Sequence, residues 1–288
     1  MELVDAIFSL VKKCSTDLPP DVEDALRKAK DLEDPGSPAE SALKTMLENV
    51  ELSRTQTIPI CQDTGTPVFY VYYPTGTSTL PVTDAIHKGV QKATKESILR
   101  PNAVDPVTGT NSGNNCGIGF PSITFVEENR DDLKISLMLK GGGSENCGAQ
   151  YRLPDAALKA GRDLNGVKNC VYHAIHAAQG KGCAPGIVGI GIGGDRGSSY
   201  LASKKVLFRK FEDNNDDPVL ANLEKEIYKN LNELGIGPMG FGGKTTVLGV
   251  KAAKMHRVPA SFFVSITYMC WACRRYSMIY RKGGIEIG

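Results

Sequence analysis

Three of the eight cysteines lie in loop segments built from glycine, proline and polar residues. This placement is the sequence feature that most limits which folds are possible. They are Cys61 in IPICQDTGTP, Cys183 in GKGCAPG and Cys270 in YMCWACRR. A chain of 288 residues can bury an adequate core without disulfide bridges. The thiols are therefore expected to be free, buried or metal-bound. Any site that joins these three requires loops far apart in sequence to meet.

The other cysteines give weaker signals. Cys270 and Cys273 form a lone CxxC pair, which is poor evidence for zinc because the second pair that would complete a tetrahedral site is missing. Cys14 and Cys170 lie in less distinctive surroundings, and we expect both to be buried structural residues.

Composition and charge exclude several classes of protein. Hydrophobic residues make up 41% and charged residues 23%, as in ordinary globular chains. The net charge is +2, with no basic excess or stripe of the kind that binds nucleic acid. No apolar run reaches the roughly 18 residues of a membrane span. The opening MELVDAIFSLVKKC lacks the basic region and cleavage site of a secretory signal, so a cytoplasmic protein is expected.

Apolar periodicity and turn signals predict alternating helices and strands. Helices are expected at 2–13, 20–31, 37–50, 82–98, 166–179, 198–211, 219–234 and 246–255. Strands are expected at 66–73, 121–127, 133–139, 186–192 and 261–269. The predicted fold is mixed α/β (α+β), a single compact domain over 1–288 with several helices around a small mixed sheet. Residues 1–50 form its helical lead-in, and long glycine-rich loops carry its sites.

The segment 189–194, GIGIGG, matches the GxGxxG pattern of dinucleotide-binding proteins. That pattern belongs at the first strand of its unit, whereas here about 180 residues precede it. Asp195 would also place a carboxylate where the pyrophosphate should lie. We interpret the segment as a strand that needs close backbone approach to its neighbours.

Three separated loop cysteines suit an iron–sulfur cluster in which one iron is not held by cysteine. Ferredoxin-type electron carriers instead use four cysteines, mostly close in sequence. An open iron is a Lewis acid that can bind and polarise a hydroxyl or a carboxylate.

Polar residues on nearby loops fit an organic-acid substrate. Gln62 and Asp63 follow Cys61, and Arg100 offers a bidentate clamp for a carboxylate. The segment 140–144, KGGGS, offers backbone N–H groups to an anion. Taken singly, Asp63 could be a turn residue, Arg100 a surface ion pair and the glycines a tight loop.

The motifs CQDTGT, LRPNAVDP, KGGGSEN, Cys-x-Pro-Gly, LASKK, FGGKT and CWA-x-RR occur in this order along the chain. Together they resemble the N-terminal, cluster-binding part of class I fumarate hydratases. These are oxygen-sensitive iron–sulfur hydro-lyases related to L-tartrate dehydratase. The resemblance, from about residue 20 to the end, implies a [4Fe–4S] cluster held by Cys61, Cys183 and Cys270. Cys273 stands where single-chain relatives have aspartate, so it is not counted as a ligand.

The resemblance also implies a set of substrate-contacting residues, namely Gln62, Asp63, Arg100 and Gly143. The family's proposed base is a threonine on a second domain, assisted by the aspartate that corresponds to Asp63. Because this chain stops at GGIEIG, it resembles an alpha subunit whose beta subunit is a separate protein. A homo-oligomer of the alpha chain or an alpha–beta heteromer is expected.

The expected reaction is the reversible hydration of fumarate to L-malate, a step of the tricarboxylic acid cycle. One alternative is the alpha subunit of L-tartrate dehydratase, although KGGGSEN is closer to the fumarase pattern. The other is a non-enzymatic iron–sulfur, zinc or metal-sensing protein.

One position departs from the family pattern. Relatives carry a substrate-binding histidine twelve residues before the last cluster cysteine, where this chain has Val258. His256 lies two residues earlier, and it could either replace the missing histidine, if the loop is re-registered, or be an ordinary histidine at the C-terminus of a helix.

Overall fold

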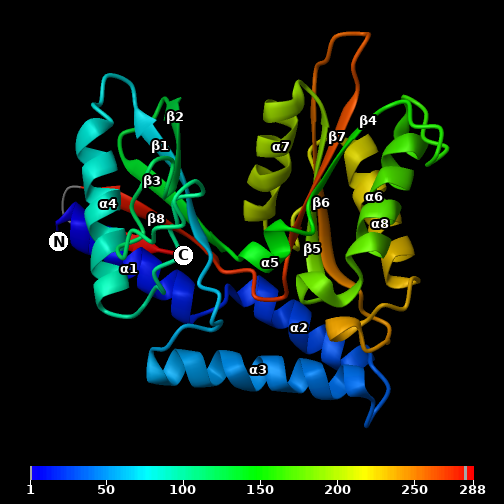
Figure 1. Ribbon diagram of the computed structural model, residues 1–288, viewed down its shortest axis with the longest axis horizontal. Coiled ribbons are helices and arrows are strands. Elements are labelled where there is room, and N and C mark those ends of the chain that lie inside the picture. Colours follow the sequence, from blue (N-terminus) through cyan, green and yellow to red (C-terminus); the bar gives the residue numbers. More distant parts are fainter. Residues whose placement is uncertain (1, 282–283) are drawn as a thin grey trace. The chain divides into compact units, whose positions relative to one another are not determined.

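The computed structural model describes residues 2–281 and 284–288, and the chain divides into two compact units. Unit 1 comprises Met1–Pro19, Glu48–Gly142 and Ala272–Gly288, and unit 2 comprises Pro20–Leu47 and Gly143–Trp271. The elements are labelled in Figure 1. Helix α3 (Pro38–Gln56) has residues in both units.

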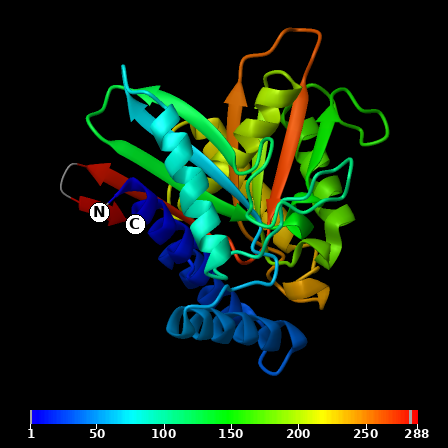
Figure 2. The same cartoon turned by 60° about the vertical axis from the view of Figure 1, so that its left-hand side comes forward.

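Unit 1 is built on a five-stranded mixed sheet with the order β2-β1-β3-β8-β9. Its elements are α1 (Leu3–Thr16), β1 (Thr66–Pro74), α4 (Leu80–Lys95), β2 (Ser122–Glu128), β3 (Leu133–Lys140), β8 (Arg275–Arg281) and β9 (Gly284–Ile287). Strand β1 pairs parallel with β2 and antiparallel with β3. Helices α1 and α4 pack together across the sheet, as Figure 2 shows. Their apolar faces, with Ile7 and Ile86, meet Phe69 and Leu137 of the sheet in one buried cluster.

Unit 2 contains a four-stranded mixed sheet with the order β4-β7-β5-β6. Its strands are β4 (Ala149–Arg152), β5 (Gly186–Gly193), β6 (Val247–Met255) and β7 (Phe263–Met269). Its helices are α2 (Pro20–Leu32), α6 (Leu164–Ala178), α7 (Arg196–Lys205) and α8 (Pro218–Asn232), with 3-10 turns η1 (Gln179–Gly182), η2 (Val206–Phe208) and η3 (Pro238–Gly240). The short helix α5 (Gly142–Glu145) begins at the last residue of the preceding unit 1 segment.

The two faces of this second sheet carry different side chains. Val188 and Ile190 of β5 face the apolar cluster formed with α6 and α8. The alternate residues Gly189 and Gly191 face α7, on the other side of the sheet (Figure 1). A Cβ atom at Gly191 would lie 2.1 Å from the backbone oxygen of Ser199 in α7. Close helix approach therefore explains the GIGIGG pattern, as the sequence predicted.

Aspartates fix the start of three helices in unit 2. Asp163 accepts a hydrogen bond at the start of α6, and Asp217 caps α8, which opens with a proline. Asp195 forms a capping box at α7 with Ser198. The N-terminal N–H groups of α7 are thus satisfied by a protein carboxylate, in agreement with the rejection of a pyrophosphate site.

The predicted helix at 246–255 is wrong, because this segment is strand β6. It pairs parallel with β5 from Val247 to Met255, and its first six residues are buried. The run Lys251–Lys254 (KAAK) has a helical composition, but Val247 and Val250 suit a strand, and pairing outweighs local propensity. Gly249 also leaves room for the ring of Phe211.

The other predicted helices and strands are present, with shifts at their ends. The mixed α/β class is confirmed, and the strands divide between two sheets. The predicted helix at 198–211 is shorter, because α7 ends at Lys205 and a 3-10 turn follows. Strands β4, β8 and β9 were not predicted. None of the helices in the described part of the chain is long and apolar enough to cross a membrane.

Cys14 and Cys170 are fully buried, as the sequence predicted. Burial raises the pKa of each thiol to about 12, so both stay protonated at neutral pH. The Cys14 thiol donates to the backbone oxygen of Arg274 at 3.0 Å. Both residues are therefore structural.

Candidate functional site

Cys61, Gln62 and Arg100 line one hollow of about 460 Å3 in unit 1. The remaining lining residues are Ile58, Pro59, Thr64, Thr94, Ser97, Leu99 and Pro101. The Cys61 residue is half-buried, whereas Gln62 and Arg100 are exposed. The structure thus groups a thiol, an amide and a guanidinium around one space, as a metal-assisted organic-acid site requires.

A buried asparagine positions the Arg100 segment. The Asn115 amide donates to Thr94 Oγ1 and to the Arg100 carbonyl, both at 2.9 Å. Its carbonyl oxygen accepts from the backbone N–H groups of Asn102 and Ala103. Every polar atom of this 2% exposed side chain is therefore used to hold the loop.

Asp63 joins two sequence motifs within unit 1. Its Oδ2 accepts from the backbone N–H of Gly142 at 2.7 Å, and its Oδ1 accepts from Gly65 N–H at 3.0 Å. Gly141 also lies against this carboxylate, since a Cβ there would be 3.0 Å from Oδ2. The carboxylate is thereby fixed against the KGGGSEN loop.

Arg274 supplies a buried positive charge beneath the same loop. This residue is 1% exposed, and its Nη2 donates to the Asp63 carbonyl at 2.9 Å. Its Nε and Nη1 have no hydrogen-bond partner, and no described carboxylate forms an ion pair with it. A buried, unpaired cation is costly, so this position favours a negatively charged group near the Asp63 loop.

Cys183 and Cys270 lie on neighbouring segments of unit 2. The backbone N–H of Trp271 donates to the Cys183 carbonyl at 3.2 Å. Cys183 has a left-handed backbone with φ of 57°, and its N–H donates to the Gly180 carbonyl at 3.0 Å. Both cysteines are half-buried.

Tyr268 is the packing centre of this cysteine region. Its ring lies against Gly182 and Gly186, where added Cβ atoms would come within 2.3 and 2.1 Å of it. Burial raises the pKa of the Tyr268 phenol well above its usual value, and nearby Cys270, Cys147 and Cys183 raise it further. Three cysteines therefore surround one buried tyrosine.

Gly143 lies in the first turn of α5 and is exposed. A Cβ atom there would meet no other atom within 4 Å. The thiol of Cys147 donates to the Gly143 carbonyl at 3.5 Å. The Gly143 Cα therefore faces unoccupied space, while its carbonyl accepts the hydrogen bond from Cys147.

Val258 and His256 lie in the exposed connection between β6 and β7, drawn in orange in Figures 1 and 2. Arg257 fixes this connection by donating to the Val258, Pro259 and Ser261 carbonyls. Cys270 follows the opposite end of β7, a strand about 20 Å long. Neither Val258 nor His256 therefore reaches Cys270 within unit 2.

Three loop cysteines are the candidate ligands for a metal group. Across 2–281 and 284–288, no three His, Cys, Asp or Glu side chains are grouped to hold one metal ion. A four-iron cluster needs a wider spacing, because each thiolate binds a different iron. Cys61 in unit 1, and Cys183 and Cys270 in unit 2, are the half-buried thiols that could each bind an iron of such a group.

Comparison with known proteins decides the family. The family model for fumarate hydratase (fumerase) matches residues 4–279. The chain belongs to the fumarate hydratase family. A protein of Geobacillus stearothermophilus that carries the name fumarate hydratase class I is 47% identical over 277 residues. The alignment covers 95% of this chain but only 54% of that relative.

Two other relatives of this chain carry the name L(+)-tartrate dehydratase subunit alpha. The one from Methanocaldococcus jannaschii is 37% identical, with 96% of each chain covered. The one from Escherichia coli K12 is 31% identical, with 96% of this chain and 90% of the relative covered. The chain thus spans about half the length of the Geobacillus relative and nearly all of these two.

Three residues near the candidate site residues have positions that the sequence did not predict. Asn115 is one of several asparagines in NSGNN, and nothing local marks it as the buried one. Arg274 belongs to the CWA-x-RR motif, but nothing in the sequence indicates that it is buried. Cys147 lies in the glycine-rich segment that was noted, but its place beside Tyr268 depends on contacts far apart in sequence.

Proposed function

We propose that this chain is the alpha subunit of a class I fumarate hydratase, which hydrates fumarate reversibly to L-malate together with a separate beta subunit. In this proposal Cys61, Cys183 and Cys270 hold a [4Fe–4S] cluster. The observation that carries it is the hollow shared by Cys61, Gln62 and Arg100, in a chain that matches the family over 4–279.

The cluster, when bound, would supply an open iron that acts as a Lewis acid toward the hydroxyl and one carboxylate of malate. Residues of this chain supply the other contacts to the bound substrate. Arg100 pairs with a substrate carboxylate, and the Gln62 amide donates a hydrogen bond beside it. The Gly143 backbone lies against the substrate, where its missing side chain leaves room.

Proton removal from the substrate carbon needs a base and a stabilised negative charge. Asp63 is held by Gly142 and Gly65, so its carboxylate keeps a fixed orientation. In the proposal it orients and assists a threonine of the beta subunit, which takes the proton. Arg100 and the buried Arg274 favour the negative charge that develops.

Tartrate is the competing substrate. The chain is 47% identical to the relative named as a fumarate hydratase and 37% and 31% identical to the two tartrate dehydratase relatives. The segment KGGGSEN also matches the fumarase pattern more closely. These two observations favour fumarate.

The proposal extends to partner and location. Two relatives are named as alpha subunits and have nearly the length of this chain, which supports a separate beta subunit. We assign the enzyme to the cytoplasm and the tricarboxylic acid cycle, as one 1–288 family domain within an alpha–beta heteromer or an oligomer of the alpha chain.

Anaerobic purification with and without the beta subunit tests this function. The loss of fumarate absorbance in the ultraviolet is followed, and L-tartrate is assayed in parallel. We expect turnover of fumarate by the complex and almost none by the alpha chain alone. Turnover of tartrate but not of malate or fumarate would select the sibling enzyme. Stoichiometric zinc, with neither activity, would support a non-enzymatic metal protein.

A further inference from the structure

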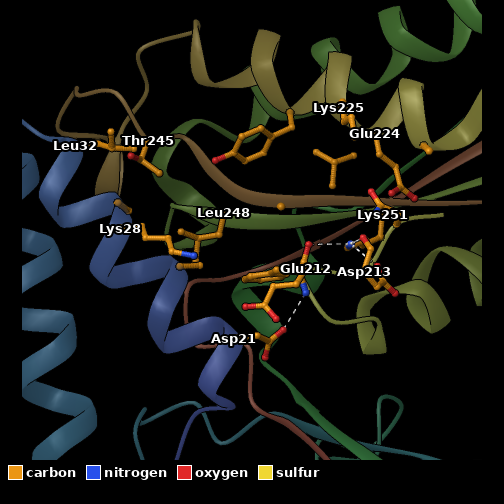
Figure 3. Close-up of a pocket in the computed structure, with 18 residues that line it drawn as sticks. Asp21, Lys28, Leu32, Glu212, Asp213, Glu224, Lys225, Thr245, Leu248 and Lys251 are labelled. Carbon is orange, nitrogen blue, oxygen red and sulfur yellow. Dashed lines mark hydrogen bonds and ion pairs between the residues drawn. The ribbon is translucent and has the colours of Figure 1, made fainter.

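A pocket of about 350 Å3 lies in unit 2 between α2, α8 and β6, away from the cysteines. We call it the α2–α8 pocket, and Figure 3 shows it in close-up. Its walls include Ala25, Lys28, Lys225, Tyr228, Leu248 and Lys251, with the segment 211–214. Its volume is within the range of pockets that hold small organic molecules.

The wall formed by α2 is fixed at both of its ends. At the start, Asp21 Oδ2 accepts from the backbone N–H of Phe211 at 3.0 Å. At the end, Glu33 accepts from the N–H groups of Lys244 and Thr245 at 2.8 and 2.9 Å. The pocket is therefore a feature of the folded unit and does not depend on a mobile helix.

The charged groups deep in the wall already have partners. Lys251 donates to the Phe211 and Asp213 carbonyls and, at 2.6 Å, to the Asp213 carboxylate. Glu224 accepts from Arg209 at 2.6 Å and from the Ala252 N–H at 2.7 Å. These groups shape the pocket, whereas the Glu212 carboxylate also lines it, is exposed and has no partner among the described residues.

Two lysines at the rim are different. Lys28 of α2 and Lys225 of α8 are exposed, line the pocket from opposite walls, and make no hydrogen bond or ion pair with the described residues. In Figure 3 the Lys28 side chain extends from α2 toward Leu248. The pocket therefore offers two unpaired cations, against one unpaired carboxylate at Glu212, around an apolar wall formed by Ala25, Leu248 and Tyr228.

The outer edge of β6 adds one polar pair. Ala252 directs its N–H and C=O away from β5, to Glu224 and Asn215. Val250 lies two residues earlier on this edge strand and lines the pocket. Its backbone N–H and C=O also point away from β5, and they have no hydrogen-bond partner among the described residues. Asn232 already pairs with Val247, so among the outward-facing residues of β6 that line the pocket only Val250 lacks a described partner, which is too short an edge for an added strand.

We propose that the α2–α8 pocket binds a small organic anion with an apolar body. Its acidic group would lie between Lys28 and Lys225, and its body would cover Leu248 and Tyr228. Fumarate and malate lack an apolar body, so this site is distinct in chemistry from the proposed substrate site. The inference does not depend on the proposed hydratase activity.

Fluorescence titration of the full chain with 8-anilinonaphthalene-1-sulfonate tests the proposal, because this probe is an aromatic anion. We expect saturable binding to one site. Replacing both rim lysines (Lys28→Ala with Lys225→Ala) should weaken binding on the order of tenfold or more. Ala25→Phe, which fills the floor, should also weaken it. The neutral probe N-phenyl-1-naphthylamine should bind more weakly and ignore the lysine changes.

Lys30→Ala with Lys229→Ala is the matched control, since it removes two lysines from the same helices outside the pocket. Binding should stay within about twofold of the parent chain, which is under 0.5 kcal/mol. Equal losses in both double variants, or no saturable binding by a chain with a native melting transition, would overturn the proposal. So would displacement of the probe by fumarate, or a dimer in solution that Ala25→Phe converts to a monomer.

Discussion

Asp63 Oδ2 and the backbone N–H of Gly142 are joined by a hydrogen bond of 2.7 Å. This bond connects CQDTGT with KGGGSEN, two motifs far apart in sequence, inside one compact unit. A carboxylate whose two oxygens accept from backbone N–H groups is held in one direction. Asp63 is therefore suited to orient a partner group and does not merely close a turn.

Asp63→Asn should lower the hydration rate of the complex by about 10²–10⁴-fold, the usual contribution of a proton-transfer residue. Asparagine can still accept from one of the two N–H groups, so the loop should remain folded. The measurements are kcat with the beta subunit and the iron content of the variant. Gly141→Ala, whose Cβ would press on Oδ2, should give a smaller loss. A rate within twofold of the parent for Asp63→Asn would remove Asp63 from the reaction.

Gly143→Ala separates a binding role from a structural one. The new methyl group meets no protein atom within 4 Å, so the free energy of unfolding should change by less than about 0.5 kcal/mol. If the substrate lies against this glycine, KM for fumarate should rise with little change in stability. An unchanged KM would show that the substrate does not approach Gly143.

Gly191→Ala tests why β5 is rich in glycine. Its Cβ would lie 2.1 Å from the Ser199 carbonyl, so α7 must shift and stability should fall by about 1–3 kcal/mol. Urea unfolding measures this loss. Gly197→Ala, where the nearest atom is 3.4 Å away, is the control and should be tolerated. Equal stability of the two variants would contradict the packing explanation.

Asp17 should make stability depend on pH in the acid range. Its burial opposes ionisation, but hydrogen bonds from Lys13 and Arg54 outweigh this and lower the pKa of the folded state. The resulting stabilisation is complete above the unfolded pKa, near 4, and disappears as the pH falls through the lower folded value. The parent chain should exceed Asp17→Asn in stability at pH 6, and the difference should shrink below about pH 4. A constant difference down to pH 3 would exclude this origin.

Local signals were enough to predict most helices. Asp217 followed by Pro218 marks the start of α8 in the sequence and in the structure, and the predicted helix at 20–31 is α2 almost without change. The burial of Cys14 and Cys170 was likewise predictable, because neither lies in a loop-forming segment.

Features that depend on distant contacts were not predictable. The composition of the 246–255 segment favours a helix, but pairing with β5 makes the segment a strand. The Asp63–Gly142 bond and the unpaired Arg274 guanidinium need the folded unit, since no neighbour in sequence reports them. The sequence could identify Cys61 and Arg100 as candidates, but only the structure places both around one hollow.

The central claim is that Cys61, Cys183 and Cys270 hold one iron–sulfur cluster. Iron and acid-labile sulfide are measured per chain after anaerobic reconstitution, in the parent and in single Cys→Ser variants. We expect about four of each in the parent and in Cys116→Ser, and a large loss in Cys61→Ser, Cys183→Ser and Cys270→Ser. Full iron and sulfide in those three variants, or zinc in place of iron, would contradict the claim.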